Sequence, residues 1–290
     1  MEIIRTIKGM KQASRAVRTQ GRTIGLVPTM GALHEGHFSL VREARRRCDC
    51  VAVSIFVNPT QFGAHEDLAK YPRPFEADRE ALERMGVDCL FAPTAEEMYP
   101  GGFCTAVTVE GLSEIFEGRS RPGHFRGVTT VVLKLLEIVR PDFAFFGRKD
   151  AQQERIIRGM ARDLNLDAQI VACPIVREVD GLALSSRNRY LGGEDRRAAS
   201  VLHKALAAVQ KEIEAGERDS ARLREKLRSV VASEPRAALD YAEIVDADTF
   251  ERVMALRGTC YVLAAAIVGG TRLIDNALIE QVGDAFRVTV

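Results

Sequence analysis

Between residues 23 and 176, short apolar runs alternate with longer stretches in which apolar side chains recur every three or four residues. The short runs have the length of buried strands, and the longer stretches have the spacing of amphipathic helices. We expect strands at 23–27, 50–57, 88–92, 143–146 and 168–172, and helices at 36–47, 76–85, 128–139 and 151–164. Because alternating strands and helices build parallel sheets with crossover helices, this part predicts a Rossmann-like α/β domain.

The pattern changes after about Arg177. Two charged helical stretches, 194–215 and 220–233, precede strand-like runs at 238–245, 260–268 and 272–279. Helices followed by consecutive strands are typical of an α+β domain. We therefore predict an α/β protein with two domains, residues 1–177 and the smaller 178–290, with a hinge within 178–189.

Composition and charge exclude several classes of protein. The hydrophobic fraction is 46% and the charged fraction 28%, and 41 basic residues nearly cancel 40 acidic ones. No global field therefore favours nucleic acid or an anionic membrane surface. No apolar run approaches the ~20 residues that span a bilayer, and six scattered cysteines without a Cys-x-x-Cys motif fit a reducing compartment. We expect a cytoplasmic protein that binds neither nucleic acid nor membrane.

One segment places glycines and histidines between a predicted strand and a predicted helix. It reads Pro28-Thr29-Met30-Gly31-Ala32-Leu33-His34-Glu35-Gly36-His37. Glycine lets a ligand approach the backbone, and the helix start offers unpaired N–H groups to phosphate oxygens. Two histidines three residues apart can donate hydrogen bonds to charge developing on a phosphate. A metal pair or ordinary capping histidines would also explain His-x-x-His alone, but the surrounding pattern favours nucleotide binding.

Two further segments follow predicted strands at the edge of the sheet where ligands of open α/β proteins bind. Lys149 and Asp150 stand at a helix start after one strand, where the lysine can neutralise phosphate charge. Gln61 follows another strand, where a loop can present its amide to a hydroxy acid. Taken alone, each of these side chains could equally be an ordinary solvated group.

The segment His34-Glu35-Gly36-His37 resembles the His-x-Gly-His signature shared by nucleotidyltransferases and class I aminoacyl-tRNA synthetases. The wider string 28–37 is similar to the pantothenate synthetase family, and the resemblance continues at 56–62, 71–73, 123–128, 146–153 and 180–188. It covers residues 23–190 densely. The resemblance implies an ATP-dependent ligase that activates pantoate as an acyl-adenylate and joins it to β-alanine, releasing pyrophosphate and AMP.

The resemblance also implies a role for individual residues. Groups expected to stabilise the adenylation transition state are His34, His37, Lys149, Ser185, Ser186 and Arg187. ATP is expected to contact Met30, Gly31, Ala32, Leu33, His34, Glu35, Gly36, His37, Gly147, Arg148, Lys149, Asp150, Val176, Leu184, Ser185, Ser186 and Arg187. Gln61 and Gln153 are expected to bind pantoate. The expected β-alanine contacts are Gln61, Asn58, Tyr71, Arg121 and His124.

Several features stay open at this point. Mg²⁺ is expected to accompany ATP, but its protein ligands are undetermined, with Asp78 and Asp150 as candidates. The family is dimeric, which implies a homodimer. Arg148 stands where the family usually has Glu, Ala151 replaces a usual aromatic residue, and Leu184 replaces Met.

Three other functions compete with the ligase. An adenylyltransferase of coenzyme A or NAD synthesis would share the His-x-Gly-His motif but would use a phosphorylated acceptor and would not need Gln61 and Gln153. A relative of the aminoacyl-tRNA synthetases would be expected to carry a basic RNA-binding extension. A regulatory nucleotide-binding protein would not need the full set of polar groups.

Overall fold

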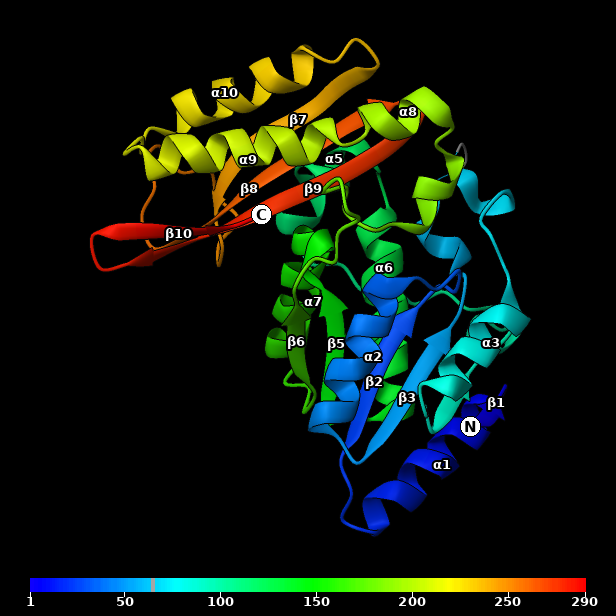
Figure 1. Cartoon of the computed structure of the whole chain (residues 1–290). Helices are drawn as coiled ribbons and strands as arrows, with labels where there is room; N and C mark the ends of the chain where they lie inside the picture. Colours follow the sequence, from blue (N-terminus) through cyan, green and yellow to red (C-terminus); the bar gives the residue numbers. More distant parts are fainter. Residues whose placement is uncertain (64–65) are drawn as a thin grey trace. The chain divides into compact units, whose positions relative to one another are not determined.

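The structure, a computed structural model, describes residues 1–63 and 66–290, and these divide into two units (Figure 1). The first unit consists of Met1–Arg148 and Gln152–Pro174, and the second of Lys149–Ala151 and Ile175–Val290. The main boundary thus lies at Pro174. The hinge expected at 178–189 belongs to the second unit, and within it the Asn188 amide donates to the Glu178 carboxylate at 3.1 Å.

A six-stranded parallel sheet forms the centre of the first unit. Its strands are β1 (Glu2–Ile4), β2 (Ile24–Thr29), β3 (Cys50–Ile55), β4 (Cys89–Phe91), β5 (Phe143–Gly147) and β6 (Gln169–Cys173). They lie in the order β1-β4-β3-β2-β5-β6, and every neighbouring pair is parallel. From β4 to β6 this is the order of doubly wound dinucleotide-binding sheets, in which ligands bind where the winding reverses, here between β2 and β5.

Helices cover both faces of this sheet. The helices along this part of the chain are α1 (Ile7–Thr19), α2 (Glu35–Arg47), α3 (Phe75–Arg84), α4 (Ala95–Met98), α5 (Glu117–Ser120), α6 (His124–Val139) and α7 (Ala151–Asp163). On β5, Ala144 and Phe146 belong to the apolar cluster that includes residues of α1, α6 and α7, whereas Phe145 belongs to the cluster with α2 and α3. Strands buried on both faces read as continuous apolar runs, which is why the sequence revealed them.

The second unit contains a four-stranded antiparallel sheet and a pair of long helices. Its elements are α8 (Gly193–Ala198), α9 (Val201–Glu214), α10 (Ser220–Ala232), β7 (Ala237–Asp246), β8 (Thr259–Val268), β9 (Thr271–Val282) and β10 (Ala285–Thr289). The strand order is β10-β9-β8-β7, and α9 and α10 share one apolar cluster with the sheet. The predicted class, a parallel α/β unit followed by a smaller α+β unit, is confirmed.

The structure differs from the expectations in two ways. The elements β1, α1, α4, α5 and β10 were not predicted, although α1 has a local start signal, because the Thr6 hydroxyl accepts the Gly9 N–H at 3.1 Å. The helix expected at 194–215 is broken into α8 and α9. At the break, the Ser200 hydroxyl donates to the Arg197 carbonyl at 2.9 Å, a local bond that competes with helical pairing.

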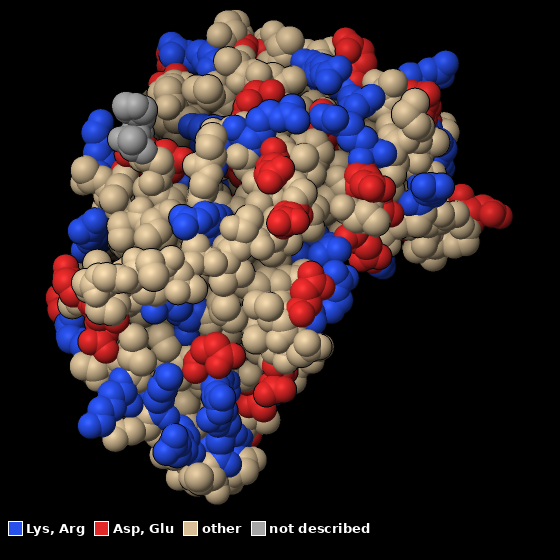
Figure 2. All heavy atoms as spheres, turned by 180° about the vertical axis from the view of Figure 1, so that it is seen from behind, with Lys and Arg blue, Asp and Glu red and all other residues tan. Residues whose placement is uncertain are grey.

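The surface matches the balanced composition. On the face seen in Figure 2, basic and acidic side chains are interspersed over most of the area, in keeping with the formal net charge of +1. Among the helices of the described residues, none has the length and apolar character needed to cross a membrane.

Candidate active site

The loop between β2 and α2 has an unusual backbone. Gly31 has φ +81°, and Ala32, which carries a side chain, has φ 52°. The positive φ favours glycine at position 31, and a Cβ atom there would also crowd the side chains of Ile55 and Asp78 at 3.1 Å. A left-handed alanine costs roughly 1 kcal/mol or more, so neighbouring groups must hold the loop in place.

Asp78, on α3, is the group that holds this loop. Its side chain is buried, and its carboxylate accepts the N–H groups of Ala32 at 2.7 Å and of Leu33 at 2.9 Å. Thr29 adds a second restraint, because its hydroxyl accepts the Gly31 N–H at 3.1 Å. Both oxygens of Asp78 therefore bind backbone and hold the loop, and its contact with Mg²⁺, for which the sequence made it a candidate, stays a prediction.

The two histidines of the motif lie at the start of α2. His34 is the N-cap, and its Nδ1 accepts the Gly36 N–H at 3.2 Å, whereas Nδ1 of His37 accepts the His34 N–H at 3.3 Å. The ring centroids are 4.1 Å apart. A ring nitrogen that accepts a hydrogen bond carries no proton, so each neutral ring has its proton on Nε2. The two imidazoles thus share one tautomer, with Nε2–H as the donor.

Gln61 is fixed by its neighbours in the first unit. The Asn58 amide donates to Gln61 Oε1 at 3.0 Å and to the Gly127 carbonyl at 3.1 Å. Gln61 Nε2 in turn donates to the Met30 sulfur at 3.0 Å, which connects it to the β2–α2 loop. A Cβ atom on Gly127 would come within 2.3 Å of the Thr60 carbonyl oxygen, so the glycine allows α6 to pack against this segment.

His124 joins Gln61 to Arg121. Its Nδ1 lies 2.8 Å from the Gln61 carbonyl oxygen, and its Nε2 lies 3.0 Å from Nη1 of Arg121. A carbonyl can only accept and a guanidinium can only donate, so the proton is on Nδ1. Burial, together with the adjacent guanidinium, lowers the pKa of His124 to about 4. The ring is therefore neutral at physiological pH.

Arg121 is already paired in this structure. Its guanidinium donates to both carboxylate oxygens of Glu66, at 2.9 and 2.6 Å. Holding the carboxylate of β-alanine would require this pair to open. Tyr71, another expected β-alanine contact, is buried and lies edge-on to Phe62 with ring centroids 5.9 Å apart. The structure brings Asn58, Arg121 and His124 together around Gln61, and their contact with β-alanine stays a prediction.

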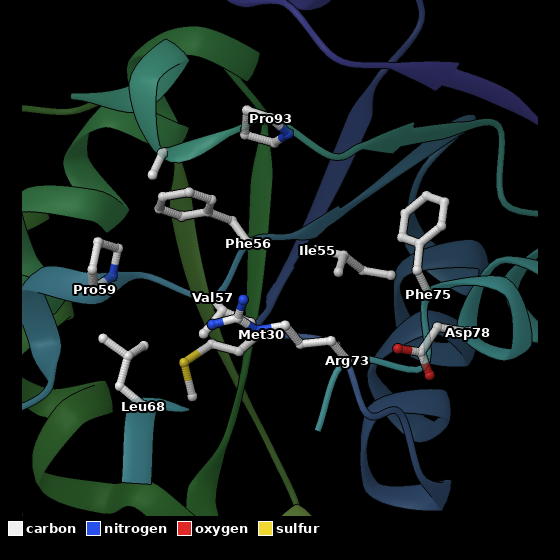
Figure 3. A pocket seen from close by; sticks show the side chains of 12 residues that line it. Met30, Ile55, Phe56, Val57, Pro59, Leu68, Arg73, Phe75, Asp78 and Pro93 are labelled. Atoms are coloured by element: carbon white, nitrogen blue, oxygen red, sulfur yellow. The ribbon is translucent and has the colours of Figure 1, made fainter. Parts of the chain in front are cut away.

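A cavity of about 360 Å³ lies beside Met30 and Gly31 (Figure 3). Its other walls are largely apolar and include Ile55, Phe56 and Val57 of β3 and the residues that follow it. In Figure 3 the Arg73 side chain extends across the cavity toward Met30, and Asp78 lies near Phe75. The β2–α2 loop is therefore bordered by space suited to an apolar group.

The two adjacent glutamines of α7 have different tasks. The Gln152 amide donates to the carbonyls of Leu112 and Ile115 at 2.8 and 2.9 Å and accepts the Glu117 N–H at 3.1 Å. Gln152 is thus committed to holding the chain before α6. Gln153, the residue expected to bind pantoate, is half-buried.

The remaining expected ATP contacts belong to the second unit, except for Gly147 and Arg148, which belong to the first. Val176 and Leu184 face each other in a hairpin, where the Leu184 N–H donates to the Val176 carbonyl at 3.0 Å. Ser185 follows, and its hydroxyl accepts the Arg187 N–H at 3.3 Å, capping a 3-10 helix at Ser186–Tyr190. A second 3-10 turn, Arg148–Asp150, precedes α7 and presents Lys149.

Sequence reasoning missed three residues that organise these segments: Asp78 as a loop anchor, Glu66 and Gln152. Each is a carboxylate or amide whose partners lie 35 or more residues away. The signal available was an acidic or amide residue inside a predicted helix or loop, which by itself does not distinguish a buried anchor from a solvated group.

The sequence model of the family described as pantoate-beta-alanine ligase matches residues 2–278. The chain belongs to the pantoate-β-alanine ligase family. It is 55% identical over 285 residues to the pantothenate synthetase of Koribacter versatilis, covering 98% of both chains. It is 56% identical over 280 residues to that of Heliobacterium modesticaldum, covering 97% of this chain and 100% of the relative.

Solved structures of the family agree with this fold. The pantothenate synthetase of Thermus thermophilus superimposes with a TM-score of 0.91 at 43% identity, over 95% of this chain and 98% of that one. The pantoate-β-alanine ligase of Francisella tularensis, solved in complex with β-γ ATP and β-alanine, gives 0.77 at 36% identity, over 95% and 97%.

Proposed function

We propose that the chain condenses pantoate with β-alanine to form pantothenate, at the expense of ATP and through a pantoyl-adenylate. Membership of the pantoate-β-alanine ligase family over residues 2–278 carries this proposal. The β2–α2 loop supports it, because it sets two imidazole donors at a helix start where the winding of the sheet reverses. An adenylyltransferase with a phosphorylated acceptor is not favoured, since the ligase family model covers residues 2–278 and the pantothenate synthetase of Koribacter versatilis aligns with 98% of this chain.

In the first half-reaction a pantoate carboxylate oxygen attacks the α-phosphorus of ATP in line. The new O–P bond forms as the bond to the β-phosphate oxygen breaks, and pyrophosphate leaves. His34 and His37 donate hydrogen bonds through Nε2 to the α-phosphate, and Lys149, Ser185, Ser186 and Arg187 stabilise the triphosphate and the leaving group. The further ATP contacts are Met30, Gly31, Ala32, Leu33, Glu35, Gly36, Gly147, Arg148, Asp150, Val176 and Leu184.

ATP is proposed to bind as its Mg²⁺ complex. Mg²⁺ usually keeps several waters and takes phosphate oxygens with one or two carboxylates. Within residues 1–63 and 66–290 no group of three or more His, Cys, Asp or Glu side chains is arranged as a metal site. A Mg²⁺ ion bound with ATP would take most of its ligands from phosphates and water and would offset phosphate charge, and Asp150 is the carboxylate proposed to assist.

In the second half-reaction the amine of β-alanine attacks the acyl carbon of the adenylate. The C–N bond of the amide forms as the acyl C–O bond to AMP breaks, the amine nitrogen gives its proton to water, and AMP leaves. Gln61 and Gln153 hold pantoate. Gln61 also borders the β-alanine side, with Asn58, Tyr71, Arg121 and His124. No covalent bond to the protein is needed, so positioning and electrostatics provide the catalysis.

The two parts of the chain are proposed to divide this work. Residues 1–177 bind ATP and pantoate as a Rossmann-like domain, and residues 178–290 act as a lid. The protein is proposed to be a cytoplasmic homodimer, as its relationship to the family implies.

Measuring pyrophosphate and AMP release tests the proposal. The wild-type protein is incubated with MgATP and with pantoate alone, β-alanine alone, or both. We expect pyrophosphate with pantoate alone, and AMP only when β-alanine is added. No release under any of these conditions would contradict the proposal and would direct the search to phosphorylated acceptors.

A further inference from the structure

Two expected phosphate-binding segments, 149–150 and 185–187, are anchored by neighbouring residues of one strand. The strand is β9, and the residues are Asp275 and Asn276, which pair with Ala264 and Leu263 of β8. Successive residues of a strand point to opposite faces of a sheet, so one of two neighbours is usually exposed at a solvated sheet. Here both are buried, with 3% and 2% of their surface exposed. Two polar side chains buried side by side require partners.

Asn276 holds the first segment. Its amide Nδ2 donates to the main-chain carbonyl of Lys149 at 2.9 Å. The bond is made to the backbone, so it fixes where the lysine leaves the chain while the ammonium group stays available to move. Lys149–Ala151 belong to the second unit, together with β9.

Asp275 holds the second segment through Arg177. The carboxylate receives two parallel hydrogen bonds from the guanidinium, at 2.7 and 2.9 Å, in a pair whose side chains are only 13% and 2% exposed. The guanidinium also donates to the Gly181 carbonyl at 2.9 Å, across the hairpin that ends at Leu184. The same pair thus fixes the base and the tip of the hairpin from which residues 185–187 emerge.

The carboxylate also connects the two anchors. Asp275 Oδ1 accepts the N–H of Asn276 at 2.8 Å, and Arg177 Nη2 lies 3.3 Å from the Asn276 carbonyl oxygen. A buried bidentate ion pair adds little net stability, but it specifies geometry and is strongly disrupted when one partner is removed. This arrangement is suited to keeping segments 149–150 and 185–187 at a fixed separation.

We propose that Asp275 and Asn276 are positioning residues that hold Lys149 and residues 185–187 as one array for the ATP triphosphate. The inference rests on the proposed function, because it requires these groups to act on ATP phosphates. The array serves only the step in which pyrophosphate leaves. Amide formation from the adenylate involves no triphosphate and does not depend on it.

The test separates the two half-reactions. Asn276→Asp keeps the size of the side chain but replaces the donor to Lys149 by a carboxylate oxygen, and Asp275→Asn removes the charge facing Arg177. Because misplacement by about 1 Å can cost roughly 10²-fold, we expect each variant to slow pyrophosphate formation from ATP and pantoate by about 10- to 100-fold. Amide formation from supplied pantoyl-adenylate and β-alanine should change less than about twofold, since its reacting groups are not displaced.

Asp240→Asn is the matched control. It makes the same chemical change in another ion pair, in which the Asp240 carboxylate accepts a hydrogen bond from Arg272 of β9 at 2.6 Å. The side chains of this pair are more exposed than those of Asp275 and Arg177. Both half-reactions should keep the wild-type rate in this variant. If Asn276→Asp does not fold, Asn276→Ser, which is neutral and shorter, replaces it in the same comparison.

The outcomes are distinguishable. Equal loss of both half-reactions, or no loss of either in folded variants, overturns the positioning role while leaving the proposed function intact. Wild-type protein that forms no pyrophosphate from ATP and pantoate, whatever the variants do, contradicts the proposed function itself.

Discussion

The β2–α2 loop of the first unit and the two proposed phosphate-binding segments of the second unit are organised in opposite ways. Buried Asp78 holds the loop, whereas buried Asp275 holds the hairpin before residues 185–187 and its neighbour Asn276 holds Lys149. Asp78 accepts backbone N–H groups and so shapes the main chain, whereas Asp275 binds a guanidinium and so fixes a hairpin. The groups they present differ too. The loop presents neutral imidazoles, and the second unit presents cations, Lys149 and Arg187.

The difference suggests a division between recognition and charge stabilisation. Neutral hydrogen-bond donors on a backbone held by buried hydrogen bonds recognise the shape of a ligand. Their interaction with the ligand depends little on counterions. Flexible cations stabilise charge wherever it develops, provided that their attachment points are fixed. The comparison predicts that substitutions in the two regions will change different kinetic parameters.

The largest effect is expected for His37→Ala. The variant loses a proposed hydrogen-bond donor to the α-phosphate, and removing one such donor typically lowers kcat by about 10²- to 10³-fold. Stopped-flow measurement of pyrophosphate formation with pantoate and ATP provides the rate. His37→Asn is the control. Its amide oxygen can still accept the His34 N–H, but its own N–H donors do not occupy the position of Nε2, so this variant separates loss of the donor from loss of the contact with His34. Adenylation by His37→Ala at near wild-type rate would remove His37 from the mechanism.

Asp78→Asn should produce an intermediate effect. An amide offers one acceptor oxygen where the carboxylate offers two, so one of the two N–H groups at Ala32 and Leu33 loses its partner. The cost of such a buried unsatisfied group is about 1 to 3 kcal/mol in the free energy of unfolding.

Urea unfolding and the KM for ATP check this prediction together. The same Asp→Asn change at Asp275 is expected to act on kcat for adenylation, so the pair compares the two regions directly. Unchanged stability and an unchanged KM in the Asp78 variant would show that the loop does not depend on its carboxylate.

The effect that is smallest at neutral pH, and grows only on acidification, is a pH dependence of stability due to His124. Its pKa is lowered to about 4 in the folded protein, from an ordinary value near 6.5, because the ring is buried beside Arg121. The neutral ring therefore contributes stability that is complete above about pH 6.5 and is lost as the pH falls toward 4. Between pH 7 and pH 5 the loss should be about 2 kcal/mol.

Unfolding free energies measured at the two pH values, for wild type and for His124→Gln, isolate this contribution. The glutamine does not titrate and can still donate to the Gln61 carbonyl, so the variant should show a weaker decline. Parallel declines would assign the acid sensitivity to other groups.

The sequence predicted those parts of the site whose members are neighbours along the chain. The loop of residues 28–37 was identifiable because its strand, glycines, histidines and helix start are consecutive. The anchors were not, since Asp78 lies 45 residues from Leu33 and Asp275 lies 98 residues from Arg177. An isolated aspartate in a helix or strand pattern gives no sign of which distant backbone or cation it will meet.

The same limit applies to the fold. Strands buried on both faces were visible as apolar runs, whereas β10, with an exposed and half-buried pattern, was not. The start of α6 at His124 was also missed. It depends on Gly123, which adopts φ 82° and turns the chain into the helix four residues before the apolar periodicity begins at Val128.

The assignment of Lys149–Ala151 to the second unit has a consequence for dividing the protein at the gene level. A cut after codon 177 would leave Lys149 on one polypeptide and Asn276, which donates to its carbonyl, on the other. The separate halves could regain adenylation only by reassembling around that hydrogen bond. A circular permutant opened at the same position would retain both residues in one chain. Comparing it with the two separate halves would distinguish the effect of changing the order of residues from the effect of placing Lys149 and Asn276 on different polypeptides.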